Sequence, residues 1–275
     1  METIAFVRLK TSRFILGSNP FSGFSHQGVE RDNLMRHYFK TEVIKATLRA
    51  AESQGITTVL ARTDHHVMRF LMEYWDEGGR MQWFAQTCPE VGSHEACIER
   101  AAQGGAVACH IHGGVMDSLL ASKRLSEVQP AVNLIRSKGM LAGIAGHDPR
   151  VFDWAEQNLD VDYYMCSYYN PISRPASGEH VSGSEEVYRD ENRRAMIARI
   201  RTLSRPVIHY KILAAGRNDP REAFRTAASA MRDSDAVCVG VFPKDNPRMI
   251  WEDLAIFEQA WRQSRAGGRT GRCEA

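Results

Sequence analysis

Residues 141–146 read Leu-Ala-Gly-Ile-Ala-Gly, and the residues 149–158 that follow begin Pro-Arg-Val-Phe-Asp-Trp. The first segment is short and apolar and ends at a glycine, which is typical of a buried β-strand. The second segment has apolar residues three and four positions apart, which is typical of an amphipathic helix. A strand followed by such a helix is the repeating unit of a parallel α/β fold.

The same unit recurs from one end of the chain to the other. Eight units, with no linker and no change of composition between them, favour a closed (β/α)8 TIM barrel over a doubly wound sheet. We predict a single barrel domain over residues 1–266, a tail over 267–275, and a candidate lid or simple insertion over 170–183. The predicted strands are 14–19, 57–62, 82–86, 107–112, 141–146, 162–166, 207–211 and 236–241, and the predicted helices are 42–53, 67–75, 93–103, 118–138, 149–158, 185–203, 220–231 and 247–262.

Composition narrows the class of protein. The 35 Lys and Arg against 33 Asp and Glu give a net charge of +2, so a nucleic-acid or membrane-surface partner is not expected. No segment has the length of a membrane span, and residues 1–4 do not resemble a secretory signal. The six cysteines have no metal-finger spacing and are expected to be buried thiols. We therefore expect a cytoplasmic protein that acts on a small molecule.

Histidines gather where the predicted strands end. In a barrel, the active site lies at those ends, and imidazoles there suit acid–base chemistry or metal binding. Because alternate strand residues face the same side, His110 should project with His112, and His209 with Lys211. We expect both pairs to face the barrel interior, although one member of each could be a packed core residue. The histidines at or beyond strand ends are His26, His65, His66, His110, His112, His147 and His209.

Further polar side chains fall at the same ends and are candidates for binding substrate. Lys244 precedes a helix whose amide groups could hold an anion, but it could equally be a solvated loop lysine. Asp64 could orient the imidazole of His65 or lie at the surface. The candidate substrate-binding residues are Asn19, Arg62, Asp64, Gln86, Asn170 and Lys244.

Several motifs together resemble the aldo-keto reductases. Residues 139–147 are similar to the fifth-strand motif of that family, and Tyr169-Asn170-Pro171 is similar to its sixth-strand motif. Residues 207–216 are similar to the seventh-strand segment, and Val239-Gly240 with Glu252-Asp253 to the final cofactor loop. The likeness follows the order of the chain and covers most of it. It implies the (β/α)8 barrel and, by analogy, carbonyl reduction with NADPH.

The catalytic tetrad implied by the resemblance is not intact. The positions of the Asp, Tyr, Lys and His of the family fall on Leu60, His65, about Gln86, and His112, so only the histidine is kept. The tyrosine is the proton donor in carbonyl reduction, and its loss removes the acid that hydride transfer needs. The Ser-Asn that contacts the nicotinamide is also replaced, by Gly146-His147.

Our main hypothesis is therefore a non-redox enzyme, a lyase, hydratase or isomerase, that acts next to a carbonyl of a small sugar-like substrate with a divalent metal such as Zn, Mn or Fe. The metal would polarise the carbonyl, and Lys211 would serve as base or as a clamp for an enolate. Tyr169 would bind substrate hydroxyls. The candidate catalytic residues are Lys211, His112, His209 and Tyr169, and the candidate metal ligands are His65, His112, His147 and His110.

Two alternatives stay open. In the first, NADPH still binds across the seventh and eighth strands, Lys244 or Arg248 holds its 2′-phosphate, and His65 or His112 is the proton donor. In the second, the barrel is a non-catalytic binding or regulatory protein. The sequence does not reveal an oligomeric state.

Overall fold

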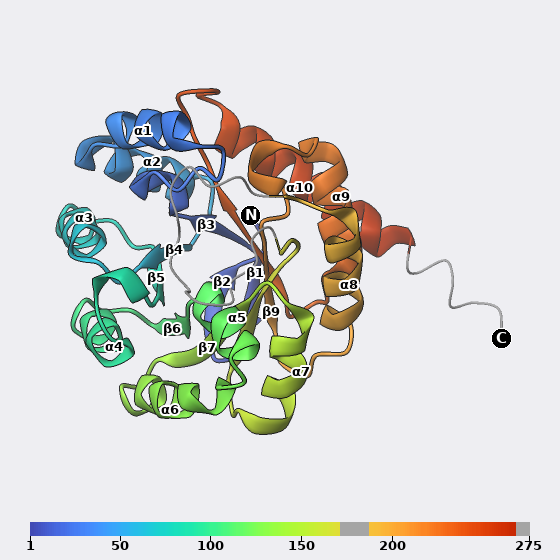
Figure 1. The fold of residues 1–275 in the computed structure, drawn as a ribbon. Coiled ribbons are helices and arrows are strands. Elements are labelled where there is room, and N and C mark those ends of the chain that lie inside the picture. Colours follow the sequence, from blue (N-terminus) through green and yellow to red (C-terminus); the bar gives the residue numbers. More distant parts are fainter. Residues whose placement is uncertain (171–186, 268–275) are drawn as a thin grey trace.

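The computed structural model of this protein describes residues 1–170 and 187–267. Eight parallel strands close into a barrel in the order β10-β3-β4-β5-β6-β7-β8-β9, with helices around it (Figure 1), which confirms the predicted fold. All eight predicted strands are present. They are β3 (Phe14–Gly17), β4 (Thr58–Arg62), β5 (Gln82–Gln86), β6 (Ala108–Ile111), β7 (Leu141–Gly146), β8 (Tyr163–Ser167), β9 (Val207–Tyr210) and β10 (Ala236–Gly240).

The helices match the predicted segments with two exceptions. Residues 29–38 form a helix that was not predicted, and residues 118–138 are not one helix, because α5 ends before Lys123, whose φ of 59° breaks the helical path. The α-helices are α1 (Val29–Tyr38), α2 (Thr41–Ser53), α3 (His65–Asp76), α4 (His94–Gln103), α5 (Gly113–Ala121), α6 (Gln129–Ser137), α7 (Pro149–Asn158), α8 (Asp190–Ile200), α9 (Pro220–Ala230) and α10 (Met249–Gly267). Short 3-10 turns lie at Asn19–Ser22, Pro89–Val91, Leu125–Val128 and Ala214–Gly216.

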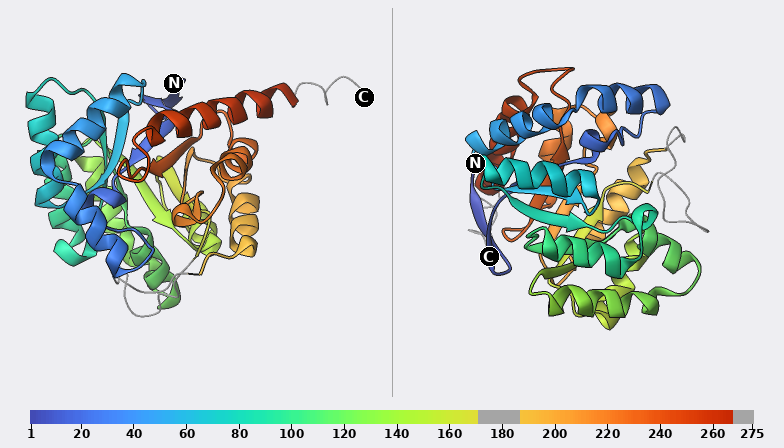
Figure 2. Two further views of the ribbon diagram at one scale, coloured as in Figure 1. Left: turned by 90° about the horizontal axis from the view of Figure 1, so that it is seen from above. Right: turned by 90° about the vertical axis from the view of Figure 1, so that its left-hand side faces the viewer.

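An antiparallel hairpin, β1 (Thr3–Phe6) with β2 (Leu9–Ser12), closes one end of the barrel. Figure 2 shows it outside the ring of helices at the end where the N-terminus lies. The ring of Phe6 is fully buried and packs 5.9 Å from Phe84 and 5.6 Å from Tyr163, both inside the barrel. The hairpin therefore covers the amino ends of the strands, and a ligand site is expected at their carboxyl ends.

Alternation along each strand separates two hydrophobic layers. One set of side chains, including Ile15, Leu60, Phe84 and Met165, fills the barrel interior with the hairpin. The neighbouring residues on the same strands pack against the helices in a much larger cluster. This two-sided burial explains why the strands have almost continuous apolar runs.

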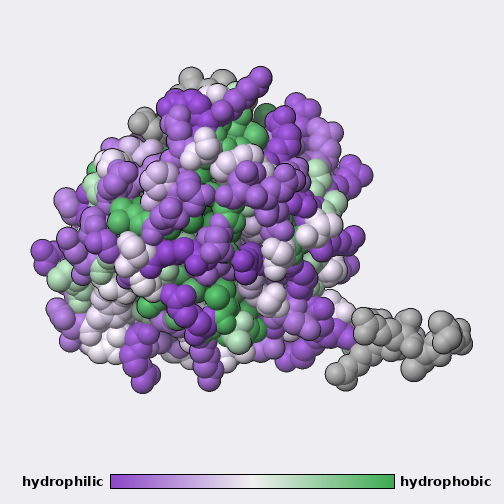
Figure 3. All heavy atoms as spheres, turned by 90° about the horizontal axis from the view of Figure 1, so that it is seen from below, coloured by the Kyte–Doolittle hydropathy of each residue, from purple (hydrophilic) through white to green (hydrophobic). Residues whose placement is uncertain are grey.

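Figure 3 shows a face that is mainly hydrophilic, with separate hydrophobic areas between charged residues. Within residues 1–170 and 187–267, no helix has the length and apolarity needed to cross a bilayer. The predicted tail from 268 onward and the candidate lid from 171 onward lie outside the described residues, whereas Gly267 still belongs to α10.

Five of the six cysteines confirm the expected buried thiols. Cys88, Cys97, Cys109, Cys166 and Cys238 are buried and free, and Cys273 lies outside the described residues.

Candidate active site

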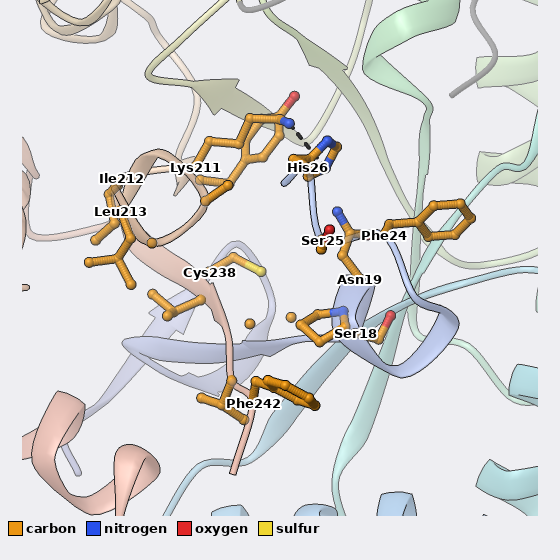
Figure 4. A pocket seen from close by; sticks show the side chains of 18 of the residues that line it. Ser18, Asn19, Phe24, Ser25, His26, Lys211, Ile212, Leu213, Cys238 and Phe242 are labelled. Carbon is orange, nitrogen blue, oxygen red and sulfur yellow. Dashed lines mark hydrogen bonds between the residues drawn. The ribbon is translucent and has the colours of Figure 1, made fainter. Parts of the chain in front are cut away.

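A cavity of about 520 Å³ opens at the carboxyl ends of β3, β9 and β10. Its wall combines apolar side chains with polar and charged ones, and such a mixture suits a polar small molecule. Figure 4 shows Lys211 and His26 meeting at one end of this cavity and Phe242 at the other. The polar lining side chains include Asn19, Gln86, Tyr210, Lys211, Asn218 and Asp253.

The end of β9 supplies two neighbouring cavity residues, Tyr210 and Lys211. Within the strand, Ile208 packs in the barrel interior, with Tyr210 against the same cluster, while Val207 belongs to the helix-facing cluster. Strict alternation would send Lys211 toward the helices. Its φ of 57° ends the strand geometry, and both Tyr210 and Lys211 line the cavity.

Lys211 contacts an imidazole from the loop after β3, which is separated from β9 by β10 alone. Its Nζ lies 3.2 Å from Nε2 of His26, in the loop after β3 (Figure 4). His26 also has a left-handed backbone, with φ of 57°. A non-glycine residue rarely adopts this conformation, and such residues gather at functional sites because the surrounding fold must hold them there.

Hydrogen bonds and an ion pair connect the segment around His26 to the loops after β9 and β10. Arg217 donates to the carbonyl of His26 over 2.9 Å, and Gln27 donates to the carbonyl of Ala215. Arg31, at the start of α1, pairs with Asp245. These links fix the position of the imidazole that faces Lys211.

A chain of three side chains leads from the cavity into the protein. The hydroxyl of Tyr210 lies 3.2 Å from Nε2 of His147, and Nδ1 of His147 lies 2.6 Å from Oδ2 of Asp117. The other oxygen of Asp117 accepts the backbone N–H groups of His147 and Asp148, at 3.0 and 3.2 Å. Asp117 is thus held as an acceptor, which places a proton on Nδ1 and leaves Nε2 to exchange one with Tyr210.

A glycine makes room for this chain. Gly113 begins α5, directly after β6, and a Cβ there would lie 3.0 Å from both the Tyr210 hydroxyl and Cε1 of His147. The contact is tighter than ordinary packing permits. The sequence Gly113-Gly114 is therefore partly explained by the close approach of Tyr210 and His147.

His110 confirms the expected direction but lies deeper than a rim residue. It is fully buried within the barrel, and its Nδ1 is 3.2 Å from the hydroxyl of Tyr163. Burial lowers its pKa to about 3, so the imidazole is neutral at pH 7. The sequence allowed either a functional residue or a packed core residue at position 110. The burial and the hydrogen bond fit a packed core histidine best.

The prediction that His209 faces the interior is wrong. Its ring is fully buried outside the barrel, with Nε2 3.3 Å from Asp235 and Nδ1 3.0 Å from the hydroxyl of Tyr168. The side chains of Ile208 and Tyr210 face the barrel interior, so the alternate residue His209 faces the helices. The prediction had assigned the two faces of β9 the other way round. Tyr169 is likewise buried among the helix-facing residues, where its hydroxyl accepts from Asn218 at 2.7 Å.

The predicted metal ligands do not assemble. Among the described ranges 1–170 and 187–267, no group of three or more His, Cys, Asp or Glu side chains could hold a metal ion. His65 is exposed at the first position of α3, His110 lies deep in the barrel, and His147 is engaged by Asp117. His112 is half-buried at the N-cap of α5, where its backbone N–H donates to the hydroxyl of Thr87 over 3.0 Å. The described residues therefore do not support the predicted divalent-metal set, because these side chains lie at different depths and do not converge on one point.

Of the predicted substrate-binding residues, Asn19 and Gln86 line the cavity. Arg62 instead pairs with Asp64 at 3.1 Å and with Glu90 at 2.5 Å. Asp64 caps α3 by accepting from Val67, and so does not orient His65.

Lys244 and Arg248 are exposed beyond β10, outside the cavity wall, and Asn170 is half-buried after β8. Catalysis by Lys211, His112 and Tyr169 stays a prediction. So does substrate binding by the six candidate residues, Asn19, Arg62, Asp64, Gln86, Asn170 and Lys244.

Asp253 is a buried carboxyl in the cavity wall. It lies on α10 with an exposed fraction of 6%, and burial together with the neighbouring Glu252 raises its pKa to about 7. The sequence pattern had drawn attention to it only as part of Glu252-Asp253. Tyr210 and Asp117 were missed entirely, and the available signal was that Ile208 and Tyr210 share a face of β9.

Comparison with known proteins bears on the fold. No family model matches this chain, and no curated protein matches it. A crystal structure of a candidate aldo-keto reductase from Pseudomonas aeruginosa is 18% identical, covers 92% of each chain, and has a TM-score of 0.62. An aldo-keto reductase from Bacillus halodurans in its holo form is 12% identical over 96% of each chain, with a TM-score of 0.57.

A further barrel enzyme is about as similar. A truncated 3-deoxy-D-arabino-heptulosonate 7-phosphate synthase from Thermotoga maritima has a TM-score of 0.58 at 12% identity, over 97% of this chain and 93% of that one. The resemblance to the aldo-keto reductases is confirmed at the level of the (β/α)8 fold. Identities this low leave the reaction to be argued from the site.

Proposed function

We propose that this protein is an enzyme that moves protons next to the carbonyl group of a small, polar, sugar-like substrate, as a lyase, hydratase or isomerase. The observation that carries the proposal is the chain Tyr210–His147–Asp117, which ends at the cavity. A buried His–carboxylate pair behind a cavity hydroxyl is an arrangement that can supply and recover a proton.

In this proposal, Tyr210 donates a hydrogen bond, and then its proton, to the carbonyl oxygen. When His147 is protonated, its Nε2–H donates to the tyrosine oxygen, and the carboxylate of Asp117 stabilises the imidazolium. The hydroxyl of Tyr210, which also donates to the carbonyl of Gly146 over 3.4 Å, then turns its hydrogen toward substrate. Asp117 is a positioning residue, because it acts only through His147.

The second proton site is the Lys211–His26 pair. Removal of a proton from the carbon next to the carbonyl produces an enolate, and its negative charge needs a cation or a donor nearby. His26 accepts the proton, and Lys211 and Tyr210 stabilise the oxygen. This keeps the predicted role of Lys211 and replaces the metal by side chains that line the same cavity.

A second candidate is the NADPH-dependent oxidoreductase. One observation favours it, namely that the cavity lies at the ends of β9, β10 and β3, and the first two are the seventh and eighth barrel strands. The volume of about 520 Å³ is also within the ordinary range for ligand pockets, roughly 300–1,000 Å³.

The fit to NADPH is partial. Lys244 and Arg248 do not line the cavity, so Lys211 and Arg31 are the lining cations that could hold phosphate oxygens, and Asp253 could accept from a base or ribose donor. When bound, the nicotinamide would supply a hydride, and Tyr210 would then be the proton donor in place of His65 or His112. The same acid therefore serves both candidate reactions.

The test is proton exchange in D₂O. The purified protein is incubated with a panel of short aldoses and ketoses, including dihydroxyacetone and glyceraldehyde, and loss of the C–H signal next to the carbonyl is followed by ¹H NMR. We expect exchange that falls at least tenfold in Tyr210→Phe. Oxidation of NADPH with the same panel, without exchange, would support the oxidoreductase instead, and neither signal would leave a binding barrel.

A further inference from the structure

We propose that Lys211 is a covalent catalyst, which attacks the carbonyl carbon of the substrate and holds it as an iminium. The proposal rests on the carbonyl substrate of the proposed function and adds the nature of the bound intermediate. Lysine amines that line a barrel cavity next to a proton acceptor have the chemistry for this step. Here the acceptor is His26, whose Nε2 lies 3.2 Å from Nζ of Lys211.

The backbone has an unfavourable conformation at both Lys211 and His26, where the amine and its proton acceptor meet. Both Lys211 and His26 have φ of 57°, in the left-handed region, which is unfavourable for a residue that carries a side chain. The turn at Lys211 moves its side chain away from the helix-facing side, where His209 lies. It brings the amine into the cavity wall, beside the imidazole of His26.

The cavity that contains Lys211 has an apolar part, which favours the release of water when an iminium forms. Leu60, Met165 and Ile212 line the same cavity, and Ile212 is almost completely buried. A wall of this kind limits the water that would hydrolyse the product. Tyr210, the neighbour of Lys211 in sequence, supplies the acid on the oxygen side.

The step balances without any further reactant. His26 takes a proton from the lysine ammonium, and the amine lone pair forms the new C–N bond while the carbonyl oxygen takes the proton of Tyr210. Tyr210 recovers its proton from the new C–N nitrogen, leaving a neutral carbinolamine. Protonated His26 then gives its proton to the hydroxyl, which leaves as water as the nitrogen lone pair forms the C=N bond. Lysine ammonium and carbonyl thus become a protonated iminium and water.

The experiment is reductive trapping in the intact protein. Dihydroxyacetone or glyceraldehyde is added with cyanoborohydride, and intact mass and peptide mapping locate the product, which adds the carbonyl compound less one oxygen atom. We expect Lys211 to be labelled at least tenfold faster than Lys244, the exposed lysine that serves as an internal control. His26→Ala should slow labelling of Lys211 and leave Lys244 unchanged.

Two outcomes overturn the proposal. One is labelling of Lys211 no faster than of Lys244. The other is a Lys211→Arg protein that keeps full D₂O exchange, because arginine keeps the charge and cannot form the iminium. In both cases, exchange that still depends on Tyr210 would leave the proposed function standing, with Lys211 as a cation only. Circular dichroism of each variant checks that it is folded.

Discussion

Two Tyr–His–Asp chains lie on either side of the barrel wall. Tyr210–His147–Asp117 begins at the cavity, and Tyr168–His209–Asp235 is sealed between the barrel and the helices, with all three residues at most 1% exposed. The residue types and the order of contacts are the same. What separates them is access to a ligand, since only one tyrosine lines a cavity.

The sealed chain has the properties of a structural element. Asp235 accepts from the backbone of Val207, from His209 and from Arg232, and although burial opposes ionisation, these hydrogen bonds hold its pKa well below the usual range. The chain ties β9 to the segment before β10. A histidine beside a carboxylate is therefore no evidence of catalysis until a reacting group can reach it.

The largest effect should come from breaking the sealed chain. Asp235→Ala leaves His209 and Arg232 without their buried acceptor and should lower the free energy of unfolding by about 3–5 kcal/mol. Urea unfolding measures this. Asp233→Ala, at an exposed carboxylate nearby, is the control and should change stability by less than about 0.5 kcal/mol. A stable Asp235→Ala protein would contradict the structural role.

Breaking the chain that begins at the cavity, Tyr210–His147–Asp117, should lower the activity. Tyr210→Phe should reduce the exchange rate about 100-fold, equivalent to about 2.7 kcal/mol, because it removes the acid and keeps the ring. Tyr168→Phe is the matched variant, and it should keep activity and lose about 1 kcal/mol of stability with its hydrogen bond to His209. Equal activity losses in the two variants would mean that access to the cavity does not distinguish the chains.

Asp253 provides a test by pH. Its pKa is raised from 3.8 to about 7, so the folded state holds the proton more tightly than the unfolded state does. Stability from this group is complete below the unfolded pKa and is lost as pH rises toward 7. Between pH 5 and 8 the loss should be about 2.5 kcal/mol.

Thermal unfolding of the wild type and Asp253→Asn across that range measures the difference. The variant should lack this part of the pH dependence, and parallel curves would show that Asp253 is not protonated in the folded protein.

The smallest effect is expected from a substitution that displaces Tyr210 and His147 without removing either side chain. Gly113→Ala places a methyl 3.0 Å from the Tyr210 hydroxyl and from His147, so both must shift. We expect about a tenfold lower exchange rate, because small displacements of catalytic groups are costly. The pH profile of exchange should change with it, since the contact between Tyr210 and His147 sets the proton supply. An unchanged rate and profile would separate Tyr210 from His147 in function.

The barrel was predictable because it depends on local patterns. Apolar runs such as 141–146, each followed by an amphipathic segment, located all eight barrel strands. The order of the motifs indicated the same fold. The hairpin of residues 3–12 was missed because each of its strands has only four residues. Helix α1 was missed because it buries only Asp32 and Met35, so its apolar periodicity is weak.

The sequence by itself determined that polar side chains would gather at the carboxyl ends of parallel strands, since period and topology place them there. Tertiary structure alone decided which of them share a cavity. His209 was assigned the wrong face, Lys211 reached the cavity through a left-handed turn, and Asp117 came from a helix far along the chain from Tyr210. The physical reason is that a one-residue change of phase, or one positive φ, reverses the side to which a strand residue points, and no local pattern encodes either.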